Sequence, residues 1–449
     1  MSKAIDKIKN IKLVKTLTNI WRIEDLRSRI LITLLFVAIY RFGSYVVLPG
    51  IDTEALEGLK NQTEGGLMSL LDMFSGGAFS KASIFALGIM PYISASIVMQ
   101  LLGIAVPYFQ KMQREGESGR RKMSQYTRYL TVPILVFQGI FYLINLKNQT
   151  AGAALYSSLD WNMFILYATI ILAAGSMFVL WLGERITDKG IGNGVSIIIM
   201  IGIIARFPTA VIQEFSTRVG GQGGLVMFLI EIVLFLAVIA AAILLVQGVR
   251  QVPVNYAKKI AGARQIGGAR QYIPLKPYAA NVMPIIFAQA IMFIPVTLAQ
   301  FSGSKLNPVV SQLIDNNSFI YNLIFAVLII LFTYLYTAIT INPVQMAEDM
   351  KRNNGFIPGI KPGKETADYI DKVMSRITFP GSLFLAIIAI LPAFAGIFGI
   401  QREFAAFFGG TSLLILVGVV LDTLMQIESH LMMRHYDGLL DTGRVRGEH

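Results

Sequence analysis

Cysteine is absent from this chain of 449 residues, and histidine and charged residues are scarce. Without cysteine there is no disulfide, no thiol nucleophile and no cysteine-ligated metal site. The three histidines, His430, His435 and His449, all lie near the C-terminus, where solvated tail residues are a better interpretation than metal ligands. These absences exclude thiol chemistry and disfavour a metal site.

The low charge is the more informative absence, because charged residues make up 15% of the chain and hydrophobic residues 54%. A soluble domain carries about 25% charged residues. A bilayer core about 30 Å thick takes roughly 20 apolar residues per helix, and runs of that length recur along nearly the whole chain. The composition therefore predicts an all-α polytopic membrane protein. Ten approximate spans are expected at residues 28–48, 84–106, 127–146, 161–182, 195–215, 225–248, 281–301, 319–341, 376–399 and 411–433.

Lysine and arginine are distributed unevenly between the two sides that ten spans define. Segments on the N-terminal side, with the adjoining span ends, hold 31 of the 39 basic residues, and the opposite side holds eight. Cytoplasmic segments of membrane proteins carry the excess of lysine and arginine, so both termini are expected in the cytoplasm. The same bias accounts for the net charge of +12 without a nucleic-acid partner. Residues 1–27 mix aliphatic and lysine residues in the pattern of an amphipathic segment on an anionic membrane surface.

Catalytic arrangements are missing from the sequence. "GIGNG" at 190–194 imitates a phosphate-binding loop, but no strand precedes it and no lysine-serine pair follows, so a turn between two spans is the better interpretation. The candidate ionisable residues within spans are Glu231 and Asp422, for which helix packing and a functional role both stay open. The chain is therefore expected not to be an enzyme and to need no cofactor, and a conduit that holds no specific ion is favoured.

Residues 70–96, "LLDMFSGGAFSKASIFALGIMPYISAS", begin like a membrane helix but carry a glycine pair, serines, a lysine and a proline. A re-entrant loop is permitted here, because non-helical backbone is tolerated at membrane depth where protein or a water-filled cavity surrounds it. Nearby, Ile89 and Ile93 are four residues apart, as are Val195 and Ile199, so each pair occupies one helix face, toward lipid or toward the interior. Amides within the spans, which either join helices or line a seam that parts, are Gln100, Gln138 and Gln289.

Long motifs resemble the SecY family, the central subunit of the bacterial protein-export channel. "MFSGGAFSKASIFALGIMPYISASI" is similar to that family's second span, "REGESGRRKMSQYTRY" to the cytoplasmic loop after it, and "WLGERITDKGIGNGVSIIIM" to the link between the fourth and fifth spans. "VNYAKK", "NPVQMAEDMKRNNGFIPGIKPGKETADYIDKV" and "GGTSLLILVGVVLDT" continue the similarity in the family's order, over roughly residues 20–440.

The resemblance implies ten transmembrane helices in two five-helix halves around a central hourglass pore, with a re-entrant plug half-helix. The halves would be residues 28–218, with spans 1–5 and a plug at 66–80, and residues 219–433, with spans 6–10, followed by a cytoplasmic tail at 434–449. It also implies a function: passing unfolded secretory polypeptides across the bacterial plasma membrane and releasing transmembrane segments laterally into the bilayer.

Four sets of residues take roles from the resemblance. The plug would include Leu70, Leu71, Met73, Phe74, Ser75, Gly76 and Gly77. An aliphatic pore ring, which would keep a narrow passage dry, would be Ile89, Ile93, Val195, Ile199, Ile286 and Ile415. The lateral gate would be lined by Ser94, Gln138 and Gln289. Two cytoplasmic docking loops, 249–280 and 342–375, would bind partners through Lys258, Lys259, Arg264, Arg270 and Lys361.

Two of these positions depart from the family pattern, since valine stands at 195 where isoleucine is common and lysine at 361 where arginine is usual. Lysine keeps the charge but lacks the planar fork of arginine, which puts a two-pronged contact in doubt. The implied partners are an obligate SecE, SecG, the ATPase SecA, the ribosome, signal peptides, unfolded polypeptides and the lipid bilayer. Two other functions remain open: a secondary transporter for a small solute, and a membrane insertase without a pore.

Overall fold

The computed structural model of the chain describes residues 23–52, 72, 74–149, 160–221, 224–256, 259–261, 264–266, 270–277, 283–289, 291–292, 312 and 318–442. Within these residues, seven helices are long and apolar enough to cross a membrane. They are α8 (Glu117–Gln149), α9 (Trp161–Lys189), α10 (Gly194–Val219), α11 (Gly224–Gln247), α14 (Phe319–Thr340) with the following α15 (Pro343–Arg352), α16 (Lys364–Ile397) and α18 (Gly410–Thr442). The expectation of a helical, multi-span membrane protein is confirmed, and the count of ten spans stays a prediction.

Two more of the expected spans correspond to helices that are not among these seven. The first coincides with α3 (Glu24–Gly43), which carries Arg27, Arg29 and Arg41 and is not among the seven. The second is broken into α6 (Met90–Ala105) and α7 (Pro107–Arg114), which meet at a bend of 100°. Val106 is extended between them (φ −110°, ψ 119°), because a residue before proline is driven out of the helical region.

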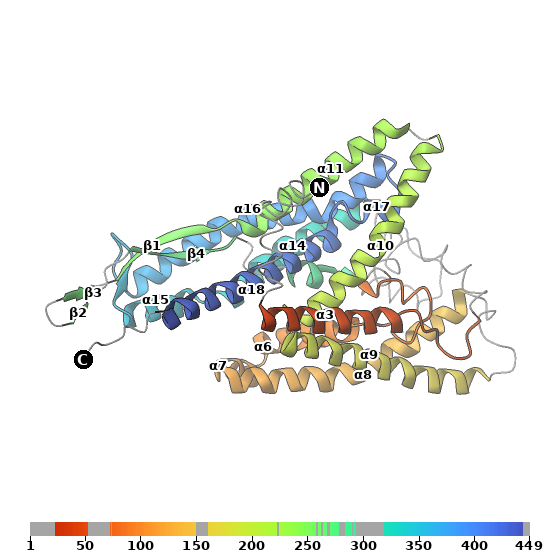
Figure 1. The fold of residues 1–449 in the computed structure, drawn as a ribbon, viewed down its shortest axis with the longest axis horizontal. Coiled ribbons are helices and arrows are strands. Elements are labelled where there is room, and N and C mark those ends of the chain that lie inside the picture. The colour runs from red at the N-terminus through yellow and green to blue at the C-terminus, as the bar shows by residue number, and fades with distance from the viewer. Residues whose placement is uncertain are drawn as a thin grey trace. The chain divides into compact units, whose positions relative to one another are not determined.

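The chain divides into two compact units, residues 1–208 with 419–449 and residues 209–418. In the first unit α9 packs against both α3 and α8, and α6 packs against α8, as their near-parallel ribbons show (Figure 1). Leucine, isoleucine, alanine and aromatic side chains fill the space between these helices and the turns before α6. This core consists of Leu48, Ile51, Phe79, Ala82, Ala86, Leu87, Leu135, Tyr142, Leu143, Leu146, Phe164, Ala168 and Leu172.

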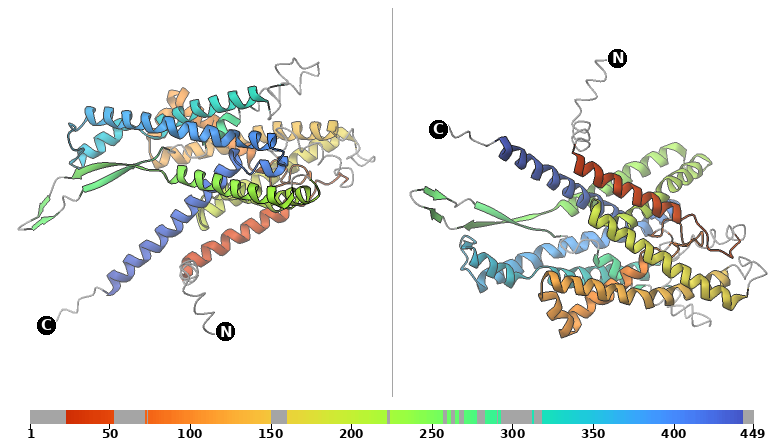
Figure 2. Two further views of the ribbon diagram at one scale, coloured as in Figure 1. Left: turned by 90° about the horizontal axis from the view of Figure 1, so that it is seen from above. Right: turned by 60° about the horizontal axis from the view of Figure 1, so that its bottom comes forward.

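The second unit joins α14, α16 and α11 with a small sheet outside the apolar helices. Strand β1 (Arg250–Tyr256) pairs antiparallel with β4 (Arg270–Leu275) on one side and with β5 (Gly355–Phe356) on the other. The sheet therefore links the two loops that were expected at 249–280 and 342–375. The ribbon of β1 and β4 projects from the helices and carries the β2 (Lys259–Ala261) and β3 (Arg264–Ile266) hairpin at its far end (Figure 2).

One hydrophobic core closes the base of this ribbon. Alternate residues of β1 point inward, so that Val252 and Val254 are buried while Gln251 is exposed, as expected for a strand with one covered face. They pack with side chains of β4, α15, the turn after α15 and the start of α16, namely Leu275, Met350, Ile357, Ile370 and Met374. The two cytoplasmic loops of the prediction are therefore a single folded body.

Several boundaries differ from those expected. α16 begins at Lys364, inside the expected loop 342–375, and α18 continues to Thr442, inside the expected tail. The second span was expected from residue 84, but helix begins only at Met90. Pro91 lies in the first turn of α6, where its missing N–H is not needed, so it starts this helix and does not kink it.

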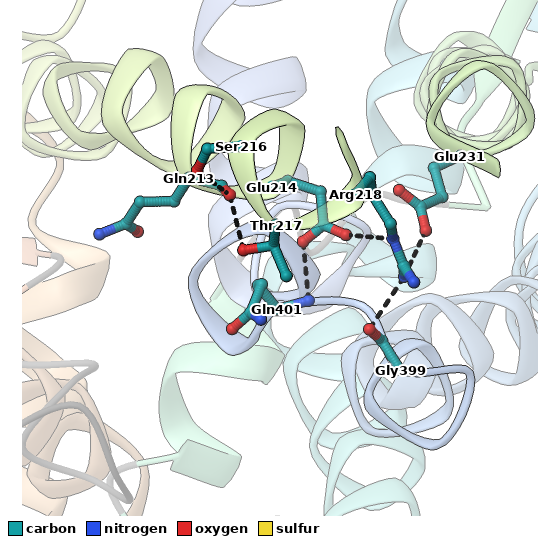
Figure 3. Close-up of polar contacts among 8 residues, drawn as sticks. All are labelled: Gln213, Glu214, Ser216, Thr217, Arg218, Glu231, Gly399 and Gln401. Carbon is teal, nitrogen blue, oxygen red and sulfur yellow. Dashed lines mark hydrogen bonds and ion pairs between the residues drawn. The ribbon is translucent and has the colours of Figure 1, made fainter. Parts of the chain in front are cut away.

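A buried ionic cluster, Glu214, Arg218 and Glu231, joins three segments of the second unit (Figure 3). Arg218 lies 2.8 Å from the Glu214 carboxylate and 2.6 Å from that of Glu231 on α11. It also donates a 2.9 Å hydrogen bond to the carbonyl of Gly399, while Glu214 accepts one of 2.8 Å from the Gln401 N–H. Glu231 is thus held by a buried arginine that also binds the main chain after α16, which favours a helix-packing role for Glu231.

We expect Arg218→Met to lower the free energy of unfolding by about 3–5 kcal/mol, because it leaves two buried carboxylates without their counter-ion. Thermal unfolding of the purified protein in detergent measures the change. Arg121→Met is the matched control, since Arg121 makes a 2.7 Å ion pair with Glu117 within α8 but both side chains of that pair are more than three-quarters exposed. Equal unfolding temperatures for the two variants would contradict a structural role for the ionic cluster.

Candidate functional site

The glycine-rich segment, residues 72–89, belongs to the first unit, and most of its described residues form turns. Asp72 and Phe74 are helical, and residues 75–89 form successive turns before α6 begins. Gly76, Gly77 and Gly88 have φ values of 67°, 86° and 52°, in the left-handed region that glycine reaches without the penalty a side chain brings. The glycines are therefore needed to turn the chain. Of the predicted plug, residues 66–71 and 73, with Leu70, Leu71 and Met73, lie outside the described residues.

The serines of this segment supply partners for its main chain. Ser75 Oγ donates to the Asp72 carbonyl at 3.1 Å and accepts from the Phe79 N–H at 3.0 Å. Ser83 Oγ accepts from the Phe85 N–H at 3.2 Å. Since buried backbone groups need partners, these hydroxyls replace the hydrogen bonds that a helix would have made.

Helices around the segment hold it from several directions. Tyr142 of α8 donates a 2.8 Å hydrogen bond to the Phe79 carbonyl, and the two rings lie 4.7 Å apart. From α3, Tyr40 donates to the Ser75 carbonyl at 3.2 Å and Arg41 to the Gly76 carbonyl at 3.0 Å. Phe74, Ser75, Gly76 and Gly77 are all buried. The segment is consequently a packed part of the first unit.

The segment lies directly on α10. A Cβ atom at Gly76 would be 2.9 Å from the Gly202 Cα, and one at Gly202 would be 2.8 Å from the Phe74 carbonyl oxygen. Two backbones therefore meet at a distance that only glycine allows. Four residues along α10, Arg206 makes an ion pair of 2.7 Å with Asp72.

The predicted pore-ring residues are distributed over both units. Ile89 is buried just before α6, and the Ile93 N–H donates to its carbonyl at 3.1 Å, which sets the two one turn apart. Val195 and Ile199 lie on one face of α10, four residues apart. Ile286, in the short helical stretch 283–289, and the buried Ile415 of α18 belong to the second unit. Convergence of the six on one axis stays a prediction.

The three predicted gate residues have different surroundings. Ser94 donates to the carbonyl of Met90 at 3.1 Å, and Gln138 is half-buried on α8. Gln289 is buried, and its Oε1 has no hydrogen-bond partner among the described residues. The gate itself stays a prediction.

Predicted docking residues lie on the projecting ribbon and beside its base. Lys259 is on β2, Arg264 on β3 and Arg270 on β4, while Lys258 lies outside the described residues. The Lys361 side chain is 85% exposed, and its ammonium is 3.7 Å from Glu365. Such an exposed pair holds a side chain weakly, so Lys361 is accessible at the surface of the folded body.

Sequence reasoning missed the contacts that hold the glycine-rich segment. In the sequence, Arg206 is one of the eight basic residues on the side opposite the N-terminus, and Asp72 falls within the predicted plug 66–80 with no role of its own. The available signal was chemical, because an acid in an apolar segment and an arginine within an apolar span each require a counter-charge. No spacing rule connects residues that are 134 positions apart.

We expect Gly202→Ala to lower the stability of the first unit by about 1–3 kcal/mol, as overpacking commonly does. The added methyl would lie under 3 Å from the main chain of residue 74, so the glycine-rich segment or α10 must shift. Hydrogen exchange of amides 74–80 should rise with the lower unfolding temperature. Gly139→Ala in α8 is the control, because its Cβ would make ordinary contacts of 3.5 Å or more. Unchanged exchange in Gly202→Ala would refute the close approach.

Comparison with known proteins gives one consistent result. The family model described as SecY matches residues 83–424. The protein translocase subunit SecY of Halalkalibacterium halodurans is 42% identical over 435 residues, covering 95% of this chain and 99% of the relative. One solved structure concerns the plug domain of the SecY protein, which stabilises the closed state of the translocation channel and maintains a membrane seal. It matches with a TM-score of 0.62 at 16% identity, covering 94% of this chain and 95% of its own.

A second solved structure, Sec61 in the canine ribosome–channel complex from the endoplasmic reticulum, matches with a TM-score of 0.57 at 15% identity. It covers 94% of this chain and 95% of its own. At such low identities the two structures support the fold alone. The near-full-length identity to the bacterial relative and the extent of the family match establish the relationship in sequence, and on that ground the chain belongs to the SecY family.

Proposed function

We propose that this chain forms a protein-conducting channel, which passes unfolded secretory polypeptides across the plasma membrane and releases transmembrane segments laterally into the bilayer. The observation that carries the proposal is the 42% identity, over almost the whole length of both chains, to a protein translocase subunit. The described structure adds a physical reason. A turn-rich segment enclosed by apolar helices is suited to closing a passage, because such backbone is tolerated at membrane depth only inside protein or beside water.

In this proposal the glycine-rich segment is the plug and the six aliphatic residues form the ring. A narrow ring of aliphatic side chains dewets and so opposes the passage of small ions. It offers no hydrogen-bond partner or charge to a polypeptide, so chains of any sequence pass with little discrimination. Ser94, Gln138 and Gln289 line the lateral gate, where water and a signal peptide replace hydrogen-bond partners during opening.

The folded body formed by both cytoplasmic loops is the docking surface for the ribosome or for SecA. Its hairpin carries Lys259 and Arg264, and clustered lysine and arginine give sequence-independent affinity for ribosomal RNA phosphates. SecE clamps the channel as an obligate partner and SecG lies at its periphery. The chain resides in the bacterial plasma membrane with both termini in the cytoplasm. The chain is not an enzyme, and the energy for transport comes from its partners or from the membrane potential.

Reconstitution tests the channel function. The chain, assembled with SecE and SecG in liposomes, is expected to protect a secretory precursor from external protease when SecA and ATP are present. A precursor without its signal sequence and a reaction without ATP are the controls. Absence of protection in a correctly assembled complex would overturn the proposal, and protection of one midplane pocket by a small solute would favour a secondary transporter instead.

Deletion of residues 66–80 tests the role of the plug. We expect the deletion to raise the resting ion conductance of the assembled complex in planar bilayers, because the passage loses its stopper while the ring remains. An insertase without a pore would show no conductance with or without these residues. Single-channel traces identical to those of the intact complex would therefore contradict the plug.

A further inference from the structure

We infer that Asp72 and Arg206 form a latch, the Asp72–Arg206 pair, which holds the glycine-rich segment on α10 and sets how often the resting channel opens to ions. The inference rests on the proposed channel function and assigns a positioning role to two residues of the first unit. Both are apart from the predicted ring and gate.

The ion pair joins a buried carboxylate to a partly exposed arginine. Arg206 Nη2 lies 2.7 Å from Asp72 Oδ2, and the side chains are 20% and 2% exposed respectively. The other carboxylate oxygen, Oδ1, accepts a 2.7 Å hydrogen bond from the Ser80 N–H. Asp72 therefore does two things at once: one oxygen shapes the turns between residues 72 and 80, and the other attaches them to α10.

The ion pair lies on the face of α10 that carries two of the predicted ring residues. Val195, Ile199, Gly202 and Arg206 follow one another at spacings of four, three and four residues, which keeps them on one face of a helix. Arg206 is seven residues beyond Ile199, about 10 Å along the axis. The face that carries two predicted ring residues thus continues into the glycine contact and then into the ion pair.

The latch differs in kind from the other attachments of the segment. Tyr40 and Arg41 on α3 and Tyr142 on α8 all bind main-chain carbonyls of the segment. The attachment to Arg206 instead depends on the charge of one side chain, Asp72. One substitution of that charge therefore loosens the segment from α10 while its main-chain contacts to α3 and α8 are retained.

The exposed fractions predict an order of effects. Arg206→Gln leaves a carboxylate that is almost fully buried without its counter-ion, which is the costly case. Asp72→Asn removes the charge but keeps an oxygen for the Ser80 N–H, and it leaves an arginine that is already in part exposed. Arg206→Gln should therefore release the segment more often than Asp72→Asn. The double variant has no buried carboxylate without a counter-ion, so it should release the segment about as often as Asp72→Asn does.

Resting conductance of the assembled complex in planar bilayers measures the release. We expect openings without a polypeptide to rise at least about tenfold in Arg206→Gln, consistent with the loss of a buried counter-ion, and less in Asp72→Asn. Arg206→Lys, which keeps the charge, should stay within about threefold of the native complex. Arg402→Gln removes an exposed arginine of the short helix α17 (Arg402–Ala405) and should leave the openings unchanged.

The outcomes separate the latch from the channel function. Native opening rates in both single variants, or additive effects in the double variant, would overturn the latch while protease protection of a precursor still supported the channel. Failure of the native complex to transport any precursor would instead overturn the proposed function. Where Arg206→Gln does not assemble, the exchange pair Asp72→Arg with Arg206→Asp decides: fewer openings than in Asp72→Arg alone supports the latch, and an equal or greater number refutes it.

Discussion

The structure depends on one constraint, which is that backbone N–H and C=O groups leaving helical geometry among apolar helices need partners from the protein itself. Residues 75–89 satisfy it partly with main-chain hydrogen bonds of successive turns and partly with side chains. Serine hydroxyls, the Asp72 carboxylate and donors from α3 and α8 take the place of helical hydrogen bonds. This explains why an apolar stretch carries serines: they allow non-helical chain to lie where water does not supply the missing bonds.

The same constraint explains polar residues elsewhere in the apolar helices. At the "GIGNG" turn, the N–H groups of Ile191 and Gly192 donate to Thr33 Oγ1 at 3.1 Å and to Gln426 Oε1 at 2.9 Å. In the second unit Glu214 and Arg218 bind the main chain of the segment that follows α16. Glu214 and Arg218 thus supply hydrogen-bond partners to main-chain groups beyond a helix end, whereas charged residues in coupled transporters form ion relays.

Hydrophobic runs predicted most of the helices because each run is local and its length is fixed by the bilayer. α11 and α14 begin and end within one residue of the expected spans. The contacts that define the candidate site are not local. Asp72 with Arg206, Gly76 with Gly202, and β1 with β5 each join residues about 100 or more positions apart, so periodicity carries no information about them. The roles of ring and gate came from family resemblance, because an aliphatic face toward lipid has the same spacing as one toward a pore.

Two buried ionic groups in the chain differ in a way that matches different mechanical roles. In the cluster of Glu214, Arg218 and Glu231 every member is at least 94% buried, so separating them strands charges in an apolar region, and the joint is suited to permanence. In the Asp72–Arg206 pair the arginine is one-fifth exposed, so water can solvate it when the glycine-rich segment leaves. In the proposed opening, Asp72 leaves α10 together with the segment and enters the passage, where water hydrates its carboxylate as well. An ion pair whose two partners both find water on separation costs less to break than one that stays dry, and that is the property a reversible closure requires.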